Sequence, residues 1–134
     1  MDEQNKEDLK NDKRVIIASA WWKGWNDRNI EALMSLMAKD SRLATLHSFL
    51  DPIVVDGRRV EGTEYVRAKF ERELNKLNTL DISFKQPEKI LVGDLFVELR
   101  YYLSDGKPVR EILSLDKDFL IDQVMRDVST TAWA

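Results

Sequence analysis

The spacing of the apolar residues changes along this chain from a helical to a strand period, and this change restricts the folds open to it. Up to about residue 77, apolar residues mostly recur every three or four positions, which is typical of amphipathic helices. From about residue 82 they alternate with polar residues, which is typical of half-buried strands. Three helices followed by a run of strands predict an α+β fold, in which the helices of the N-terminal half cover one face of a curved, mixed or antiparallel sheet.

Three helices are expected, the first from about residue 15, the second from about residue 30 and the third over residues 63–76. The polar segment 26–29 separates the first two, which should therefore pack as a pair. Each helix carries apolar residues at spacings that bring them onto one stripe. The stripes are Val15, Ala18, Trp22 and Trp25 in the first helix, Ile30, Leu33, Met34 and Met37 in the second, and Val66, Phe70, Leu74 and Leu77 in the third.

One strand is expected between the helices, over residues 42–47, and a meander of strands follows the third helix. The pair Gly93-Asp94 is a two-residue hairpin signal within this meander. Residues 1–12 are almost wholly polar and are interpreted as an N-terminal arm, and residues 13–134 as a single domain. The segments of the meander are residues 82–84, 89–92, 95–104, 109–115 and 119–129.

The composition excludes several kinds of site. The 134 residues include no cysteine and one histidine, which rules out disulfides, Cys-based zinc sites and paired-histidine metal sites. No metal and no organic cofactor is expected. The formal charge is −3, with acids and bases interleaved and no glycine-rich phosphate loop, so a nucleic acid partner is not expected. The chain has no long apolar stretch and a polar N-terminus, so we predict a cytoplasmic protein without a membrane span.

Two blocks of the sequence carry a resemblance to a known family. Residues 21–40, with their three tryptophans and apolar second helix, resemble the opening of the nuclear-transport-factor-two-like superfamily. Residues 60–70 resemble its glycine-started third helix, and the C-terminal meander completes the same order of elements over about residues 13–130. The superfamily includes SnoaL-like polyketide cyclases, ketosteroid isomerases and limonene epoxide hydrolase. The resemblance implies a cone-shaped α+β barrel whose pocket holds a small, largely apolar ligand.

The resemblance also bears on individual residues. When the sequence is aligned with ketosteroid isomerases, Trp21 takes the position of their oxyanion-hole tyrosine and Thr45 the position of the aspartate that acts as their base. An indole cannot replace an acidic phenol, and a threonine hydroxyl is too weak a base near neutral pH, so isomerisation by that mechanism is not expected. Glu111 falls near the protonated acid of those isomerases. Relative to limonene epoxide hydrolase, Asp127 falls at a catalytic aspartate and Glu98 near a second carboxylate.

Three residues are candidates for catalysis, each with an open alternative. His47 suits general acid/base chemistry because imidazole titrates near neutral pH, at about 6.5, or it is a hydrogen-bonded histidine at the pocket rim. Glu111 lies on the same side of its predicted strand as apolar residues, which suits a buried proton donor or acceptor. The alternative is that the strand is flipped and Arg110 faces inward. Asp127 is the third candidate, and a shift of one residue would turn Arg126 inward in its place.

The wall of the pocket is expected to contain a tryptophan, because Trp21, Trp22 and Trp25 cannot share one helical stripe when neighbours lie about 100° apart. Trp22 and Trp25 are interpreted mainly as core residues. Tyr101 and Tyr102 have opposite parity, so one of them reaches the ligand side. The predicted ligand-binding residues are Trp21, Trp25, Thr45, Phe70, Leu113 and Met125.

The side chains on the outer face of the strand predicted over residues 95–104 suggest an interaction surface. Phe96, Glu98, Arg100 and Tyr102 alternate with uniformly apolar residues, so one face of this strand is core and the other is mixed. Mixed faces of this kind suit a homodimer through the open face of the sheet, and the superfamily commonly pairs in this way. This interpretation competes with a catalytic role for Glu98.

Two functional hypotheses follow. In the first, the chain is a small SnoaL-like enzyme that needs no cofactor and transfers a proton on a small apolar molecule, as an isomerase, cyclase, dehydratase or hydrolase. In the second, it is a non-catalytic module that binds a ligand or joins subunits, with its pocket filled by its own side chains. A cavity beside His47 favours the first hypothesis, and a filled interior favours the second.

Overall fold

The computed structural model describes the backbone at residues 12–47, 55–56, 60–61 and 63–129, and the side chains at residues 12–42 and 63–129. Helices α2 (Lys13–Asn26), α3 (Ile30–Ser35) and α4 (Thr63–Leu80) belong to the first part of the chain. The strands are β1 (Met37–His47), β2 (Val55–Asp56), β3 (Val60–Glu61), β4 (Lys89–Val92), β5 (Phe96–Tyr102), β6 (Pro108–Leu115) and β7 (Ile121–Val128).

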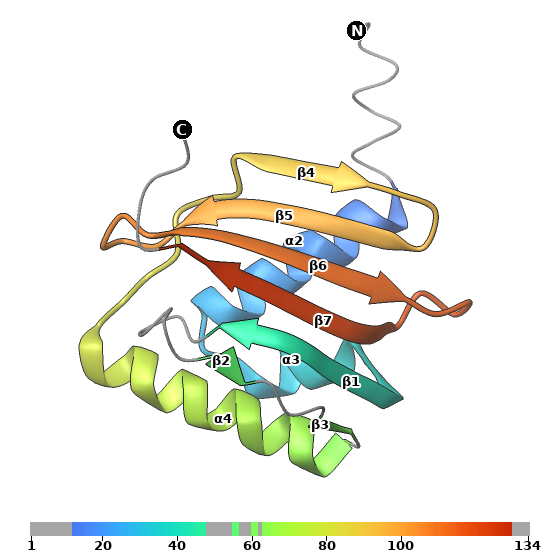
Figure 1. Ribbon diagram of the computed structural model, residues 1–134, viewed down its shortest axis with the longest axis horizontal. Coiled ribbons are helices and arrows are strands. Elements are labelled where there is room, and N and C mark those ends of the chain that lie inside the picture. The colour runs from blue at the N-terminus through green and yellow to red at the C-terminus, as the bar shows by residue number, and fades with distance from the viewer. Residues whose placement is uncertain (1–11, 48–54, 57–59, 62, 130–134) are drawn as a thin grey trace, which may run out of the picture.

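The strands form one open, mixed sheet in the order β2-β1-β7-β6-β5-β4, with β3 paired to β1. Strand β1 runs parallel to β7, and all other pairs are antiparallel. Figure 1 shows α2 passing behind the strands and α4 lying beneath the β1 edge, so the helices cover one side of the sheet. This arrangement confirms the predicted α+β class with a curved, mixed sheet against three helices.

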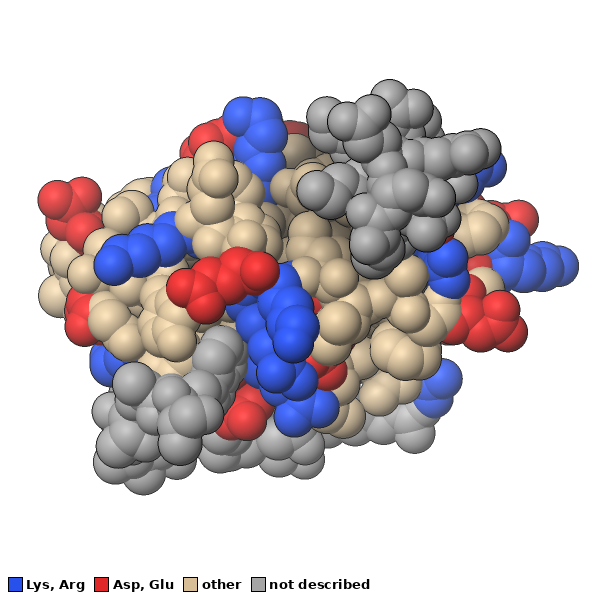
Figure 2. Space-filling view, turned by 90° about the horizontal axis from the view of Figure 1, so that it is seen from above, with Lys and Arg blue, Asp and Glu red and all other residues tan. Residues whose placement is uncertain are grey.

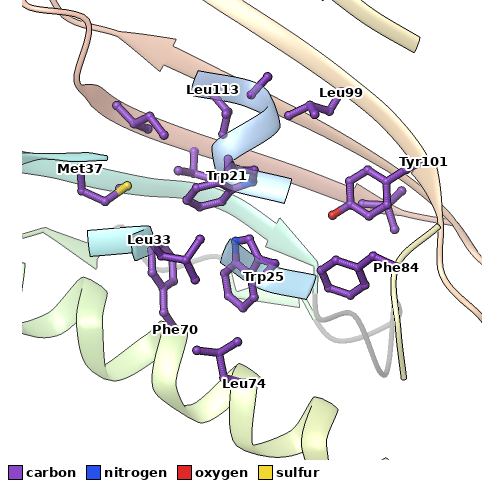
Figure 3. Close-up of a cluster of buried hydrophobic side chains, with 14 of the residues drawn as sticks. Trp21, Trp25, Leu33, Met37, Phe70, Leu74, Phe84, Leu99, Tyr101 and Leu113 are labelled. Atoms are coloured by element: carbon purple, nitrogen blue, oxygen red, sulfur yellow. The ribbon is translucent and has the colours of Figure 1, made fainter. Parts of the chain in front are cut away.

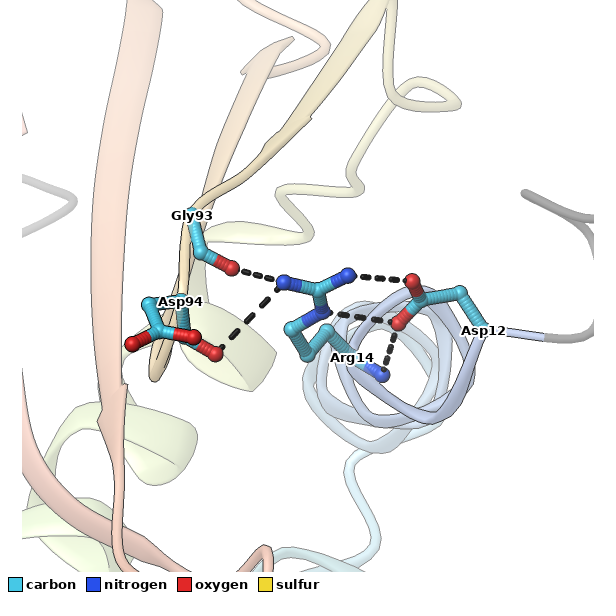
Figure 4. Close-up of polar contacts among 4 residues, drawn as sticks. All are labelled: Asp12, Arg14, Gly93 and Asp94. Carbon is cyan, nitrogen blue, oxygen red and sulfur yellow. Dashed lines mark hydrogen bonds and ion pairs between the residues drawn. The ribbon is translucent and has the colours of Figure 1, made fainter.

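The start of α2 is fixed by a cap and by a link to the sheet. Asp12 is the N-cap, and its carboxylate accepts a hydrogen bond from the backbone N–H of Arg14 at 2.8 Å. The side chain of Arg14 also donates to Asp12, and this hydrogen bond is the main reason that the pKa of Asp12 is lowered to about 2. The same guanidinium donates to the carbonyl oxygens of Gly93 and Asp94 in the β4–β5 turn (Figure 4). One arginine therefore ties the first helix to the far edge of the sheet.

The helices differ from the prediction in two places. The second helix ends at Ser35, and Met37 opens β1, so the predicted helical stripe is wrong at its last residue. In α2 the buried face contains Trp21 and Trp25, while Trp22 is half-buried and donates its indole N–H to the carbonyl of Lys85 at 2.9 Å. The apolar period alone could not separate two adjacent indoles, because either one completes a stripe with Trp25.

Gly24 explains how α3 can pack so closely on α2. It is buried on the face of α2 that contacts α3, and a Cβ atom at this position would lie 2.8 Å from Cδ2 of Leu33. Leu33 is fully buried and has little room to move. The absent side chain at position 24 therefore sets the spacing of the helix pair.

The core lies between the helices and the sheet, and most of the charged residues in the described part of the chain lie outside it. Trp21, Trp25, Phe70, Tyr101 and Leu113 are among its fully buried members. On the face seen in Figure 2, Lys and Arg side chains lie beside Asp and Glu side chains, as the interleaved sequence predicts. In the part of the chain with described structure, no helix has the length and apolarity needed to cross a bilayer.

We predict that Gly24→Ala destabilises the protein by about 1 kcal/mol. Alanine gains about 1 kcal/mol of helix propensity over glycine, but overpacking against Leu33 costs about 1–3 kcal/mol. In a Leu33→Ala background the obstruction is gone, so there Gly24→Ala should stabilise. Urea unfolding of the four proteins measures both effects. An effect of the same sign in both backgrounds would contradict the packing argument.

Candidate functional site

A buried ion pair lies at the centre of the inner sheet face. Glu111 on β6 stands directly opposite Arg126 on β7 and Leu99 on β5. Glu111 is fully buried and Arg126 is 1% exposed, and Nε of Arg126 lies 3.3 Å from Oε2 of Glu111. Each charge would be strongly unfavourable in this apolar interior without the other.

Two more donors reach the same carboxylate from other elements. Trp21 on α2 donates its indole N–H to Oε2 of Glu111 at 3.1 Å. Tyr101 on β5 donates its hydroxyl to Oε1. Glu111 therefore collects hydrogen bonds from a helix and from both neighbouring strands, and we call these four residues, Trp21, Tyr101, Glu111 and Arg126, the Glu111 cluster.

Tyr101 is held as a neutral donor. Burial raises the pKa of its phenol well above 10, and the nearby charge of Glu111 raises it further, against an opposing effect of Arg126. The ring packs against Phe84 with centroids 5.5 Å apart. At neutral pH the hydroxyl therefore keeps its proton and points it at Glu111.

Aromatic rings fill the space around the cluster. Trp21, Trp25 and Phe70 meet edge to face, with centroids 5.2–5.7 Å apart (Figure 3). The guanidinium of Arg126 lies 5.0 Å from the Trp25 ring, a cation–π distance. The charged pair thus lies against a cluster of rings that pack edge to face.

The structure brings five of the predicted site residues together in this interior. Glu111 faces inward, so of the two alternatives for β6 the flipped strand with Arg110 inside is excluded. The predicted wall residues Trp21, Trp25, Phe70 and Leu113 are all fully buried.

Asp127 and Met125 were expected in the same interior, and the structure places them on the opposite face. Both are exposed, and Arg126 points inward between them. The cause is a β-bulge: Leu115 pairs with Ile121, but the preceding Ser114 pairs with Gln123, which leaves one extra residue on β7. The extra residue reverses the alternation, so the parity counted from Ile121 gives the wrong face for everything beyond it.

Two predicted residues lie on β1 where the structure describes the backbone alone. Thr45 and His47 belong to the C-terminal part of this strand, and His47 is in register with Val55 of β2. Their side chains are outside the described residues, so the roles assigned to them stay predictions.

Sequence reasoning left Tyr101 and Arg126 open as alternatives to Tyr102 and Asp127 and did not include them among the predicted site residues. Tyr101 lies at the inward parity of β5, between Leu99 and Leu103, and a single hydroxyl in an apolar row was the available signal. Arg126 was the alternative to Asp127, and only knowledge of the bulge could decide between them.

Glu98 is separate from the interior site. It lies on the outer face of β5, where its two oxygens accept hydrogen bonds from Nε of Arg100 at 2.7 Å and Nε of Arg110 at 3.1 Å. Phe96, on the same face, is 44% exposed. The catalytic interpretation of Glu98 therefore loses its geometric basis.

A groove of about 410 Å³ lies elsewhere on the surface. None of the predicted site residues is among the residues that line it. Those residues all belong to α4: Arg72, Asn75, Lys76, Thr79 and Leu80.

Comparison with known proteins yields a likeness of structure alone. No family model and no curated protein matches this chain. A SnoaL-like protein of unknown function from Burkholderia thailandensis superposes with a TM-score of 0.73 at 19% identity, over 87% of this chain and 95% of that one. An NTF2-like protein of unknown function from Mesorhizobium loti gives a TM-score of 0.61 at 18% identity, over 87% and 91% of the two chains.

An enzyme is also among the similar structures. SalBIII, an epoxide hydrolase/cyclase-like enzyme of pyran ring formation in the polyether salinomycin, gives a TM-score of 0.64 at 14% identity, over 88% of this chain and 92% of that one. These three matches span 87–88% of this chain and 91–95% of the others. The chain therefore has the α+β cone fold of the nuclear-transport-factor-two-like superfamily, the fold of the SnoaL-like proteins.

Proposed function

We propose that this chain binds a small, largely apolar molecule inside the cone and that Glu111 transfers a proton to or from it. The observation that carries the proposal is the fully buried Glu111–Arg126 pair in an otherwise apolar interior. A buried ion pair is often no more stabilising than apolar residues of similar volume, so stability alone gives little reason for it. Ionisable groups in such surroundings are typical of functional sites.

Each member of the Glu111 cluster has a role in this proposal. Glu111 exchanges the proton, and Arg126 balances the negative charge of the carboxylate. Trp21 and Tyr101 hold the carboxylate in one orientation, since they donate to its two different oxygens. His47, at the end of β1, is retained as a candidate second proton-transfer group, and the aromatic residues Trp25 and Phe70 form the apolar wall.

The chemistry proposed here needs no metal or organic cofactor and suits a cytoplasmic protein. Isomerase, cyclase, dehydratase and hydrolase reactions can all proceed by proton transfer at an apolar substrate held away from water. The epoxide hydrolase/cyclase-like enzyme SalBIII has the same fold at 14% identity, which supports the view that this fold can host reactions of this general kind.

The proposal is tested by the molecule that the protein retains during purification. We expect solvent extraction and mass spectrometry to find the same small apolar molecule in the wild type and in Glu98→Gln, the matched control on the outer face. Glu111→Gln should carry at least tenfold less. In D2O, the wild type should exchange a proton of that molecule about 100-fold faster than Glu111→Gln, because general acid–base catalysis contributes about 10²–10⁴. An empty wild type, or equal exchange in both proteins, refutes the proposal.

The second candidate is a non-catalytic module, and the packing of the interior favours it. Trp21, Trp25 and Phe70 occupy the space between helices and sheet, and three hydrogen bonds from the chain itself already reach Glu111. In this case the buried pair serves only to hold the sheet and α2 together.

A pair of variants separates the two candidates. Arg126→Met leaves a buried carboxylate without its cation, so we expect a loss of about 3–5 kcal/mol of unfolding free energy. Adding Glu111→Gln removes the stranded charge and should recover most of that loss, as chemical denaturation will show. If the recovered double variant lacks the ligand and the proton exchange, the proton-transfer function is supported. If it retains the ligand, the carboxylate is structural.

We further propose a homodimer through the outer face of the sheet. Leu91, Phe96 and Met125 are 39%, 44% and 41% exposed on this face. The half-buried Ile112 lies in register between Met125 on β7 and Glu98 on β5, and Glu98 is in register with Leu91 on β4, so apolar side chains lie on both sides of this charged residue. An apolar centre with charges beside it is the usual composition of such an interface.

We expect Met125→Lys to convert this dimer to a monomer in sedimentation velocity experiments. Two like charges facing each other near a twofold axis would cost about 2 kcal/mol or more. Leu80→Lys is the matched control, because Leu80 is 59% exposed on α4, away from the sheet. A monomeric wild type, or a dimeric Met125→Lys, rules the interface out.

A further inference from the structure

The side of α4 that faces away from the core carries a stripe of side chains with apolar ends. Its members follow one another at intervals of three or four residues, which places them on one side of the helix: Tyr65, Lys69, Arg72, Lys76 and Leu80. Tyr65 is 70% exposed and Leu80 is 59% exposed, more than any other large apolar side chain in the described part of the chain. The two lie about 22 Å apart along the helix axis.

The middle of the stripe is basic and is bordered by a groove. Of its three cations, Arg72 and Lys76 are exposed. Both also line the groove of about 410 Å³, together with Leu80. Asn75 and Thr79 add an amide and a hydroxyl to the same lining. A partner seated along α4, which lies at the lower edge of the molecule in Figure 1, would therefore meet cations, hydrogen-bonding groups and an apolar contact.

The acids of α4 leave this row of cations one side chain wide. Glu71 accepts a hydrogen bond from Nε of Arg67 at 2.8 Å, and Arg67 also pairs with Glu31 on α3, so Glu71 lies on the α3 side of the helix. Glu73 is buried, and Glu64 lies in the first turn. A nucleic acid backbone that covered the helix would also meet Glu64 and Glu71, whereas a narrow partner would meet the cations alone.

The charges also disfavour a second copy of this chain as the partner. If α4 packed antiparallel against α4 of another copy, the apolar ends would match, with Tyr65 against Leu80. The centre would bring Lys69, Arg72 and Lys76 of one copy against the same three cations of the other, and such like-charge contacts oppose association. The complement of the stripe is therefore a helix with acids at its centre and an apolar residue near each end.

We propose that α4 binds an acidic amphipathic helix of another protein. Its acids would pair with the three cations of the stripe, and its apolar end residues would pack on Tyr65 and Leu80. A helix laid along a groove with anchors one turn apart is a recurring mode of peptide recognition. None of the stripe residues belongs to the Glu111 cluster, so this inference does not depend on the proposed proton transfer.

Three matched peptides test the proposal. Each is a fluorescently labelled helical peptide of about 18 residues, long enough to span the stripe, with leucine near both ends. The central positions carry glutamate in the first peptide, glutamine in the second and lysine in the third. By fluorescence anisotropy at low ionic strength, we expect the wild type to bind the glutamate peptide at least about tenfold more tightly than the glutamine peptide. Added salt should reduce this preference, because exposed charges are screened.

Variants connect the preference to α4. Arg72→Glu combined with Lys76→Glu should invert it, so that the lysine peptide binds more tightly than the glutamate peptide. Arg72→Gln combined with Lys76→Gln adds no acid to the helix and should reduce the preference to about threefold or less. The matched control is Lys89→Glu combined with Lys117→Glu. It makes the same change in net charge at exposed positions on β4 and in the β6–β7 turn, and should leave the preference unchanged.

Three results would overturn the proposal. The first is equal binding of the glutamate and glutamine peptides to the wild type, or no binding of the glutamate peptide up to about 1 mM. The second is unchanged binding of the glutamate peptide to the double glutamine variant, which would place the contact away from α4. The third is a single-stranded oligonucleotide that binds more tightly than the glutamate peptide and is lost in the same variant, which would assign the stripe to nucleic acid.

Discussion

The buried carboxylate of Glu111 organises this molecule. Glu111 is fully buried, and it is tolerated because a helix and two strands each send a donor to it. The same contacts fix how α2 lies across the sheet, since the indole of Trp21 must reach the middle of β6. The same aromatic side chains therefore fill the core and donate hydrogen bonds to the buried carboxylate, so apolar packing and hydrogen bonding depend on each other here.

The β-bulge between β6 and β7 decides which charge joins that carboxylate. Without the extra residue, the pairing that starts at Leu115 and Ile121 would put Met125 opposite Glu111 and turn Asp127, not Arg126, toward the interior. With the extra residue, Arg126 stands opposite Glu111, and its guanidinium also lies over the ring of Trp25. A local irregularity in one strand pair thus converts an unfavourable interior into a balanced one.

Much of the fold could be predicted from the sequence, because it depends on periods that extend over many residues. The stripe of α4 and the alternation along β5 each involve several buried side chains, so single exceptions do not hide them. The site depends on single residues instead. The choice of Trp21 over Trp22 and of Arg126 over Asp127 came from helix packing and from a bulge, and neither leaves a mark on apolar spacing.

The pairing of β1 with β7 joins a strand from each end of the domain, and this limits the order in which the sheet can form. Because β7 lies between β1 and β6, the strands β1, β2 and β3 join the strands β4, β5 and β6 only once β7 is made. On the ribosome, a chain that ends after β6 would hold Glu111 without its cation. The interior can close only after β7 has been made, so this topology favours late, cooperative folding of the domain and penalises a truncation that removes β7.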